Sequence, residues 1–98
     1  MTRGPADELA RLCNLGPASA RMLNAAGIRT EAELRDAGAV NAYRLLALHG
    51  FRPSLNFLWA IEGALRGINW LEIPAEERAR LKEELAAPWD ARAMLGLE

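Results

Sequence analysis

One stretch specifies the N-terminal half of this chain: NLGPASARMLNAAG, residues 14–27. Gly16 permits backbone conformations that other residues resist, and Pro17 suits the first position of a helix, where its missing N–H costs nothing. Small residues and then an apolar stripe follow, which predicts a tight hairpin feeding a closely packed helix. Such a hairpin leaves free backbone N–H groups at a helix N-terminus, and these form a natural anion site. The stretch therefore points to nucleic-acid phosphate rather than to catalysis.

The other segments are also helical in pattern. None of them alternates with period two, and β-branched residues are few. The sequence therefore predicts an all-α fold, a compact bundle of five to six short helices with a helix-hairpin-helix-like N-terminal half. The expected helices cover residues 6–12, 17–26, 30–38, 39–49, 55–66 and 74–86.

Several helix ends carry specific signals. Gly27 suits the position after a helix C-terminus, and Ile28 can close the hydrophobic contact of that cap. Thr30 and Glu33 form a predicted capping box, and His49 lies in a last turn, where the helix dipole favours a cation. Apolar spacing predicts the residues that face the core, with helix 55–66 at its centre: Leu9, Leu12, Ala20, Leu23, Ala26 or Met22, Val40, Tyr43, Leu46, Ala47, Leu55, Leu58, Trp59, Ile61 and Leu65.

Length and composition limit the classes of protein to consider. Ninety-eight residues, half of them apolar, make one domain, residues 1–98, with a core over about 9–85 and a tail or interface segment over 86–98. No apolar run approaches the roughly 20 residues that cross a bilayer, and no signal peptide is visible. The single cysteine, Cys13, excludes an internal disulfide and a cysteine-based metal site. We expect a cytoplasmic protein with no cofactor, no metal, no membrane partner and no small-molecule substrate.

The charge distribution is more informative than the net charge of −1, which is low for a duplex-binding protein. Residues 1–66 hold eight arginines against six acidic residues, a balance of +2, whereas residues 67–98 hold four basic residues against seven acidic ones, a balance of −3. The basic side chains are thus concentrated on the hairpin half. Five of these arginines form either one basic face or a scattered solvated surface. They are Arg11, Arg21, Arg29, Arg44 and Arg52.

Two blocks resemble a known family. The block NLGPASARMLNAAGI (14–28), followed by T-x-x-E-L, and the block SLNFLWAIEGALRGINW (54–70) are similar to the C-terminal domain of the bacterial TfoX/Sxy family. Between them, GAVNAYRLL (38–46) resembles that family's linking segment, with its Ala-Tyr-Arg. The similarity covers about residues 9–85. It implies an all-α domain related to helix-hairpin-helix modules, with a regulatory role linked to competence and DNA transformation.

The chain departs from the family pattern at two points. Full-length members carry a separate N-terminal domain, so we expect this chain to represent the C-terminal domain alone. A DNA-binding hairpin of this type usually reads Gly-x-Gly, whereas this one reads Asn14-Leu15-Gly16. Asn tolerates left-handed backbone geometry better than most residues, which allows the turn to persist.

The hairpin is the first candidate site. The amides of Ala18 and Ser19 would point at a phosphate oxygen, the Ser19 hydroxyl would assist, and Arg21 would add charge. Such contacts position a protein on nucleic acid without reading bases. The alternative is a turn that only joins two packed helices. The candidate nucleic-acid-binding residues are Asn14, Leu15, Gly16, Pro17, Ala18, Ser19 and Arg21.

Helix 55–66 contributes residues of structural interest. Trp59 and Glu62 share one face of the helix, so we expect the Glu62 carboxylate to accept hydrogen bonds from loop amides or from an arginine. Gly63 costs about 1 kcal/mol relative to Ala in a helix, and we expect another helix to cross there closely. Cys13 and His49 show no spacing for catalysis or metal binding, and Cys13 is interpreted as a small apolar filler.

A rival function comes from the C-terminal half. Trp70, Trp89 and Leu95 are candidate interface residues, because tryptophan is enriched at binding hot spots. The sequence thus supports two hypotheses for a non-enzymatic regulatory or adaptor domain. One is DNA binding through the Gly16-Pro17 hairpin, and the other is a contact with another protein or with a second copy of this chain.

Overall fold

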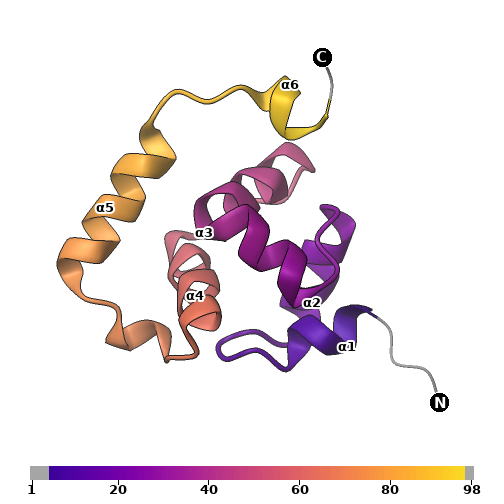
Figure 1. Cartoon of the computed structure of the whole chain (residues 1–98), viewed down its shortest axis with the longest axis horizontal. Coiled ribbons are helices and arrows are strands. Elements are labelled where there is room, and N and C mark those ends of the chain that lie inside the picture. The colour runs from indigo at the N-terminus through magenta and orange to yellow at the C-terminus, as the bar shows by residue number, and fades with distance from the viewer. Residues whose placement is uncertain (1–4, 97–98) are drawn as a thin grey trace.

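The computed structural model describes residues 5–96, and within this range it is all helical. The fold class predicted from the sequence is confirmed. The helices lie in a flat arrangement of about 43 × 38 × 21 Å (Figure 1). In chain order the elements are α1 (Pro5–Ala10), α2 (Pro17–Ala25), α3 (Glu31–Leu48), α4 (Leu55–Arg66), the 3₁₀ turn η1 (Trp70–Glu72), α5 (Ala75–Ala86) and α6 (Ala91–Met94).

The helices pack in neighbouring pairs. α1 packs on α2, α3 packs on α4, and η1 folds back against α4. α5 lies at one edge of the molecule and α6 at the end opposite the α1–α2 hairpin, as Figure 1 shows. The hairpin therefore meets the end of α4, while the C-terminal segments run around the far side.

α4 provides the centre of the core, as its apolar composition predicts. Its buried residues cover more than one face: Leu58, Trp59, Ala60, Ile61, Gly63 and Ala64. They meet fully buried leucines from three other helices, Leu9, Leu23, Leu34 and Leu46. Burial of each such side chain stabilises the fold by about 1.5–3 kcal/mol.

Two apolar residues of the expected core lie outside it. Leu55 is 39% exposed, because it occupies the first turn of α4 on the solvent side. Ala47 is also exposed, since the buried stripe of α3 passes through Ala42 and Leu46 instead. Both predictions were wrong.

Three helices end in the same way. An amide just past the helix donates back to a carbonyl five residues earlier: Ile28 to Leu23 at 2.8 Å, Phe51 to Leu46 at 3.0 Å and Ile68 to Gly63 at 3.0 Å. The residues just before these donors are Gly27, Gly50 and Gly67, each with a positive φ. This is the Schellman cap, and the prediction that Gly27 and Ile28 form one is confirmed.

Helix α3 is interrupted at Gly38. The sequence predicts two helices that meet at this residue, and the structure has two helical segments joined there by a kink, so this prediction is confirmed. Gly38 has φ +81° and ψ 165°, a conformation outside helical geometry that glycine adopts without penalty. The two expected helices are therefore the two halves of α3. The turn η1 and the short α6 lie in segments to which no helix was assigned.

None of the helices within residues 5–96 is long and apolar enough to span a membrane.

The N-terminus of α3 is closed by side chains. Thr30 Oγ1 accepts from the Glu33 amide at 3.0 Å, and Glu33 Oε1 accepts from the Thr30 amide at 3.0 Å, so the predicted capping box is confirmed. Glu33 also accepts from the Arg29 amide at 2.8 Å, and this bond is the main cause that lowers the pKa of Glu33. From α1, Glu8 Oε1 accepts from the Glu31 amide at 2.9 Å.

We predict that the capping box weakens in acid. Because the folded state lowers the pKa of Glu33 from its ordinary value of 4.5, its contribution to stability is present above that value and is lost as the pH falls through the lowered folded-state pKa. Glu33→Gln keeps an acceptor without a charge. Urea unfolding at about pH 5.5 and about pH 3 should show that the wild type loses more stability than this variant. An equal loss in both proteins would contradict the prediction.

Candidate functional site

The hairpin joins α1 to α2 through a turn whose unusual conformation lies at Asn14. Asn14 has φ +72°, in the left-handed region, whereas Gly16 has φ −136° and ψ −173°, an extended conformation open to any residue. A Cβ on Gly16 would also meet nothing within 4 Å. The expectation that Gly16 supplies a special backbone conformation was wrong, because Asn14 supplies it instead.

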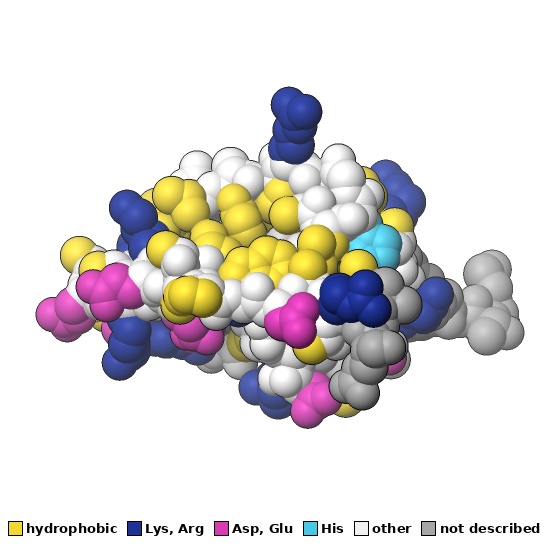
Figure 2. All heavy atoms as spheres, turned by 90° about the horizontal axis from the view of Figure 1, so that it is seen from above, with side chains coloured by type: hydrophobic (Ala, Val, Ile, Leu, Met, Phe, Trp, Pro, Cys, Tyr) yellow, Lys and Arg dark blue, Asp and Glu magenta, His cyan; other side chains and the backbone are white. Residues whose placement is uncertain are grey.

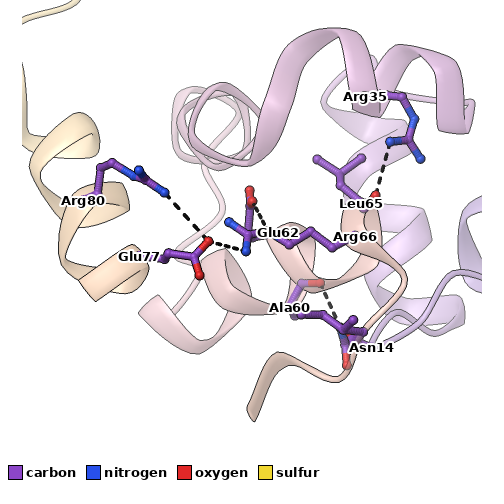
Figure 3. A network of polar contacts seen from close by, with 9 residues as sticks. Asn14, Arg35, Ala60, Glu62, Leu65, Arg66, Glu77 and Arg80 are labelled. Carbon is purple, nitrogen blue, oxygen red and sulfur yellow. Dashed lines mark hydrogen bonds and ion pairs between the residues drawn. The ribbon is translucent and has the colours of Figure 1, made fainter. Parts of the chain in front are cut away.

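The Asn14 side chain fastens the hairpin to the end of α4. Its Nδ2 donates to the Ile68 carbonyl at 2.9 Å and to the Ala60 carbonyl at 3.3 Å. Its Oδ1 accepts from the Trp70 amide at 3.1 Å. Figure 3 shows this side chain directed from the hairpin at α4. One amide group thus satisfies three backbone groups more than 45 residues away in the chain.

Gly63 makes room for this contact. A Cβ at this position would lie 2.5 Å from Asn14 Nδ2, 2.8 Å from the Ile68 carbonyl oxygen and 3.3 Å from the Trp70 Cα. The prediction of a close approach at Gly63 holds, but the neighbour is not a crossing helix. It is the hairpin side chain, together with the backbone that follows α4.

The N-terminus of α2 is open. The Gly16 carbonyl accepts from the Ala20 amide at 2.9 Å, which is the first bond of the helix. No side chain caps this end, and among the described residues the amides of Ala18 and Ser19 have no hydrogen-bond partner. Pro17 and Ala18 are exposed and Ser19 is half-buried. These amides therefore lie without a partner among the described residues, at the positive end of a helix.

The structure separates the candidate hairpin residues into two groups. Asn14 is engaged by α4 and η1, and Leu15 is buried with 8% of its surface exposed, so both residues hold the hairpin in place. Pro17, Ala18 and Arg21 are exposed, and Gly16 and Ser19 are half-buried.

The arginines do not all belong to one surface. Four of the five considered from the sequence are exposed: Arg11, Arg21, Arg29 and Arg52. Arg44 is buried, with 9% exposure. Its guanidinium donates to the Glu84 carbonyl at 2.7 Å and lies 5.0 Å from the centre of the Trp89 ring. Arg44 therefore caps the C-terminus of α5 and is not available for a basic face.

Glu62 finds an arginine, as predicted. Arg66 Nε donates to Glu62 Oε2 at 2.7 Å, one turn along α4, and Arg66 also pairs with Glu77 of α5. Figure 3 shows Arg66 between the two carboxylates. These two hydrogen bonds raise the pKa of Arg66. Glu62 thus takes part in an ion-pair network between α4 and α5, which also includes Arg80, 3.7 Å from Glu77.

The candidate interface residues differ in their environment. Trp70 is half-buried against the core, and the Arg78 guanidinium lies 5.6 Å from the centre of its ring. Trp89 and Leu95 are 40% and 41% exposed. Leu71 is 67% exposed, which the sequence reasoning missed, and only its position beside Trp70 could have drawn attention to it.

Cys13 and His49 each have a local contact. Cys13 is exposed rather than a core filler, and its Sγ lies 3.6 Å from Asn14 Oδ1. His49 caps α3, with Nδ1 2.8 Å from the Leu45 carbonyl oxygen, at the helix end where a cation was expected. Within residues 5–96 no three His, Cys, Asp or Glu side chains are arranged to hold a metal ion.

Comparison with known proteins gives one family and one solved structure. Residues 5–85 match the family described as the TfoX C-terminal domain. The crystal structure of an uncharacterized protein from Listeria monocytogenes is similar, with a TM-score of 0.73 and 28% sequence identity. The similarity covers 92% of this chain and 96% of that chain. No curated protein matches the chain.

We predict that Gly63→Ala destabilises the fold. Helix propensity alone would make this change stabilising by about 1 kcal/mol, but the added methyl group would collide with Asn14 and Ile68. We expect the free energy of unfolding to fall by about 1–3 kcal/mol, measured by urea denaturation.

A double-mutant cycle tests whether Asn14 causes this loss. Asn14→Gly keeps the left-handed backbone and removes the side chain, so Gly63→Ala should cost less in that background. Stabilisation by Gly63→Ala, or additive effects of the two changes, would contradict the interpretation.

Proposed function

Because the chain belongs to the family of TfoX C-terminal domains, we propose that it is a non-enzymatic, cytoplasmic domain that contacts the phosphates of DNA through the α1–α2 hairpin. The family is one of competence-related regulatory domains. The observation that carries the proposal is the open N-terminus of α2. The amides of Ala18 and Ser19 are unpaired among the described residues, at a helix end where the dipole favours an anion.

The rigidity of the hairpin supports this proposal. Asn14 and the buried Leu15 hold the turn against the body of the domain, so the amides keep one direction without a ligand. Binding to a preorganised site avoids the cost of ordering a loop. The exposed Arg21, which follows in α2, adds a positive charge that can approach a neighbouring phosphate.

Contacts from the two open amides would position the domain on DNA, but they would not recognise a base sequence. Phosphate contacts fix the register of a protein on a duplex but carry no sequence information. A domain of net charge −1 with one such hairpin therefore acts as an auxiliary DNA contact within a regulatory assembly rather than as a reader of a specific site.

Protein contact is the second candidate function. It is supported by exposed apolar side chains near the C-terminus, Trp89 and Leu95. Figure 2 looks onto the side where α6 lies in Figure 1, and apolar side chains gather there between basic ones. Large exposed apolar patches are typical of contact surfaces.

Gly16→Ser tests the hairpin directly. A serine at this N-cap position can accept from the Ser19 amide, so it should stabilise α2 by a few tenths of a kcal/mol while it occupies the proposed phosphate site. We expect the melting temperature to hold or rise and the affinity for duplex DNA at low salt to fall. Gly16→Ala, which fits without a clash but supplies no acceptor, is the matched control. Unchanged DNA affinity in the Gly16→Ser variant would contradict phosphate binding at these amides.

Salt dependence and charge reversal separate the two candidate functions. DNA binding should weaken with a slope of about −0.9 in log K against log salt for each phosphate neutralised, whereas an apolar protein contact should be nearly insensitive to salt. Arg21→Glu should lower DNA affinity more than Arg92→Glu, which makes the same charge change on α6, opposite the hairpin (Figure 1). Equal losses in the two variants would indicate a net-charge effect and remove the hairpin from the mechanism.

A further inference from the structure

Residues 87–96, which follow α5, are largely apolar but add nothing to the core. None of them is buried, and α6 itself contributes no buried residue. Pro88, Trp89 and Leu95 are exposed, and Met94 is half-buried. We name these four side chains the α6 patch. The segment therefore leaves apolar surface in contact with water, which is unfavourable for the isolated chain.

The α6 patch is held in place by the rest of the domain. The guanidinium of Arg44, a residue with 9% exposure, lies 5.0 Å from the centre of the Trp89 ring. Asp90 Oδ1 accepts from the Arg92 amide at 2.9 Å and so caps α6, which packs on α3. The patch therefore keeps one arrangement without a partner, and binding to it avoids the cost of ordering a flexible tail.

Apolar side chains gather on the side of the molecule where α6 lies, as Figure 2 shows. Such a gathered apolar surface is typical of contact sites, and tryptophan is enriched among the residues that contribute most to binding. Contact with a partner would remove from water the exposed parts of Trp89 and Leu95, which are 40% and 41% exposed. Association through the α6 patch therefore gains a hydrophobic contribution that the isolated chain lacks.

Two charges of opposite sign lie beside the α6 patch. Asp90 and Arg92 are both exposed, and among the described residues neither side chain forms an ion pair. They are the only charged residues within 87–96, so this segment is neutral and does not favour a strongly acidic or basic partner. A second copy related by a two-fold axis offers its Arg92 to Asp90 and its Asp90 to Arg92, so the segment is complementary in charge to itself.

We propose that the α6 patch is the contact surface of a symmetric dimer of this chain. The two patches bury Trp89 and Leu95 between the copies, and each Asp90 pairs with Arg92 of the second copy. Two chains of net charge −1 repel each other little at long range. The inference deepens the second candidate function by naming its partner, so it rests on that protein contact and not on DNA binding.

The size of the α6 patch predicts a weak dimer. Stable complexes bury about 1,200–2,000 Å² in total, and a contact centred on a few side chains of each copy lies at or below the lower end of this range. We expect reversible association between about 10 µM and about 1 mM. In sedimentation equilibrium, the average mass of the wild type should rise from 10.8 kDa towards twice this value. A wild type that stays monomeric over this range would overturn the proposal.

Lysine substitutions at two exposed leucines test where the contact lies. Leu95→Lys places a charge in the α6 patch and should weaken the dimer by about tenfold or more. Leu71→Lys is the matched control, because Leu71 is 67% exposed and lies in η1, which Asn14 joins to the hairpin. This control should leave the dimer unchanged. Equal weakening by the two lysines would place the contact elsewhere and overturn the proposal.

Charge-reversed variants test both the partner and the two-fold arrangement. In the proposed dimer, Asp90→Arg creates two like-charge contacts with Arg92, and Arg92→Asp creates two with Asp90. Each variant alone should therefore dimerise more weakly than the wild type. In a mixed dimer of the two variants, both contacts become opposite-charge pairs. An equimolar mixture should associate about tenfold more tightly than either variant alone.

The double variant Asp90→Arg/Arg92→Asp separates charge from helix capping. It loses the α6 cap, as Asp90→Arg does, but it restores both intermolecular pairs, so it should dimerise more tightly than Asp90→Arg. If the mixed sample associates no more tightly than the separate ones, the proposed pairing is wrong.

DNA binding is scored separately from dimerisation. Gly16→Ser, which occupies the proposed phosphate site, should leave the dimer unchanged, because the hairpin lies at the opposite end of the molecule from α6 (Figure 1). A monomeric wild type that binds DNA would remove only the dimer. A dimer that does not bind DNA would remove only the proposed function of the hairpin.

Discussion

The contact between Asn14 and the backbone around Gly63 is the constraint on which the arrangement of the domain depends. It joins the hairpin to the end of α4 and to η1, segments that are adjacent in space although the hairpin lies more than 45 residues away in the chain. The contact needs a left-handed residue with an amide side chain on one side and a residue without a Cβ on the other. Because buried polar groups must be paired, neither partner can change alone without a cost.

Arginine acts here mainly as a structural side chain. Arg44, Arg66 and Arg78 each bind carbonyls or carboxylates of another element, and two of them stack on tryptophan rings. A guanidinium suits this purpose because its donors form a planar fork and its face is weakly hydrated. The number of arginines in the chain is therefore a poor guide to the size of a basic surface, and the proposed DNA contact depends on the local geometry at α2.

The two ends of the molecule have different mechanical properties. The hairpin is fixed by Asn14 and Leu15 and presents unpaired amides, which suits a contact of one defined shape. Helix α5, in contrast, has one buried residue, Leu81, and is held to the body by arginine contacts at its two ends.

Local signals in the sequence were sufficient for α1 to α5, the capping box of Thr30 and Glu33 and the glycine cap at Gly27, because these depend on neighbours within a few residues. For Glu62 the sequence left two kinds of partner open, loop amides or an arginine, and the structure provides Arg66, one helical turn away. The burial of Arg44 and the partner of Gly63 were not accessible in this way. Each depends on which distant segments come together, and a periodic pattern shows that a face is buried without showing what covers it.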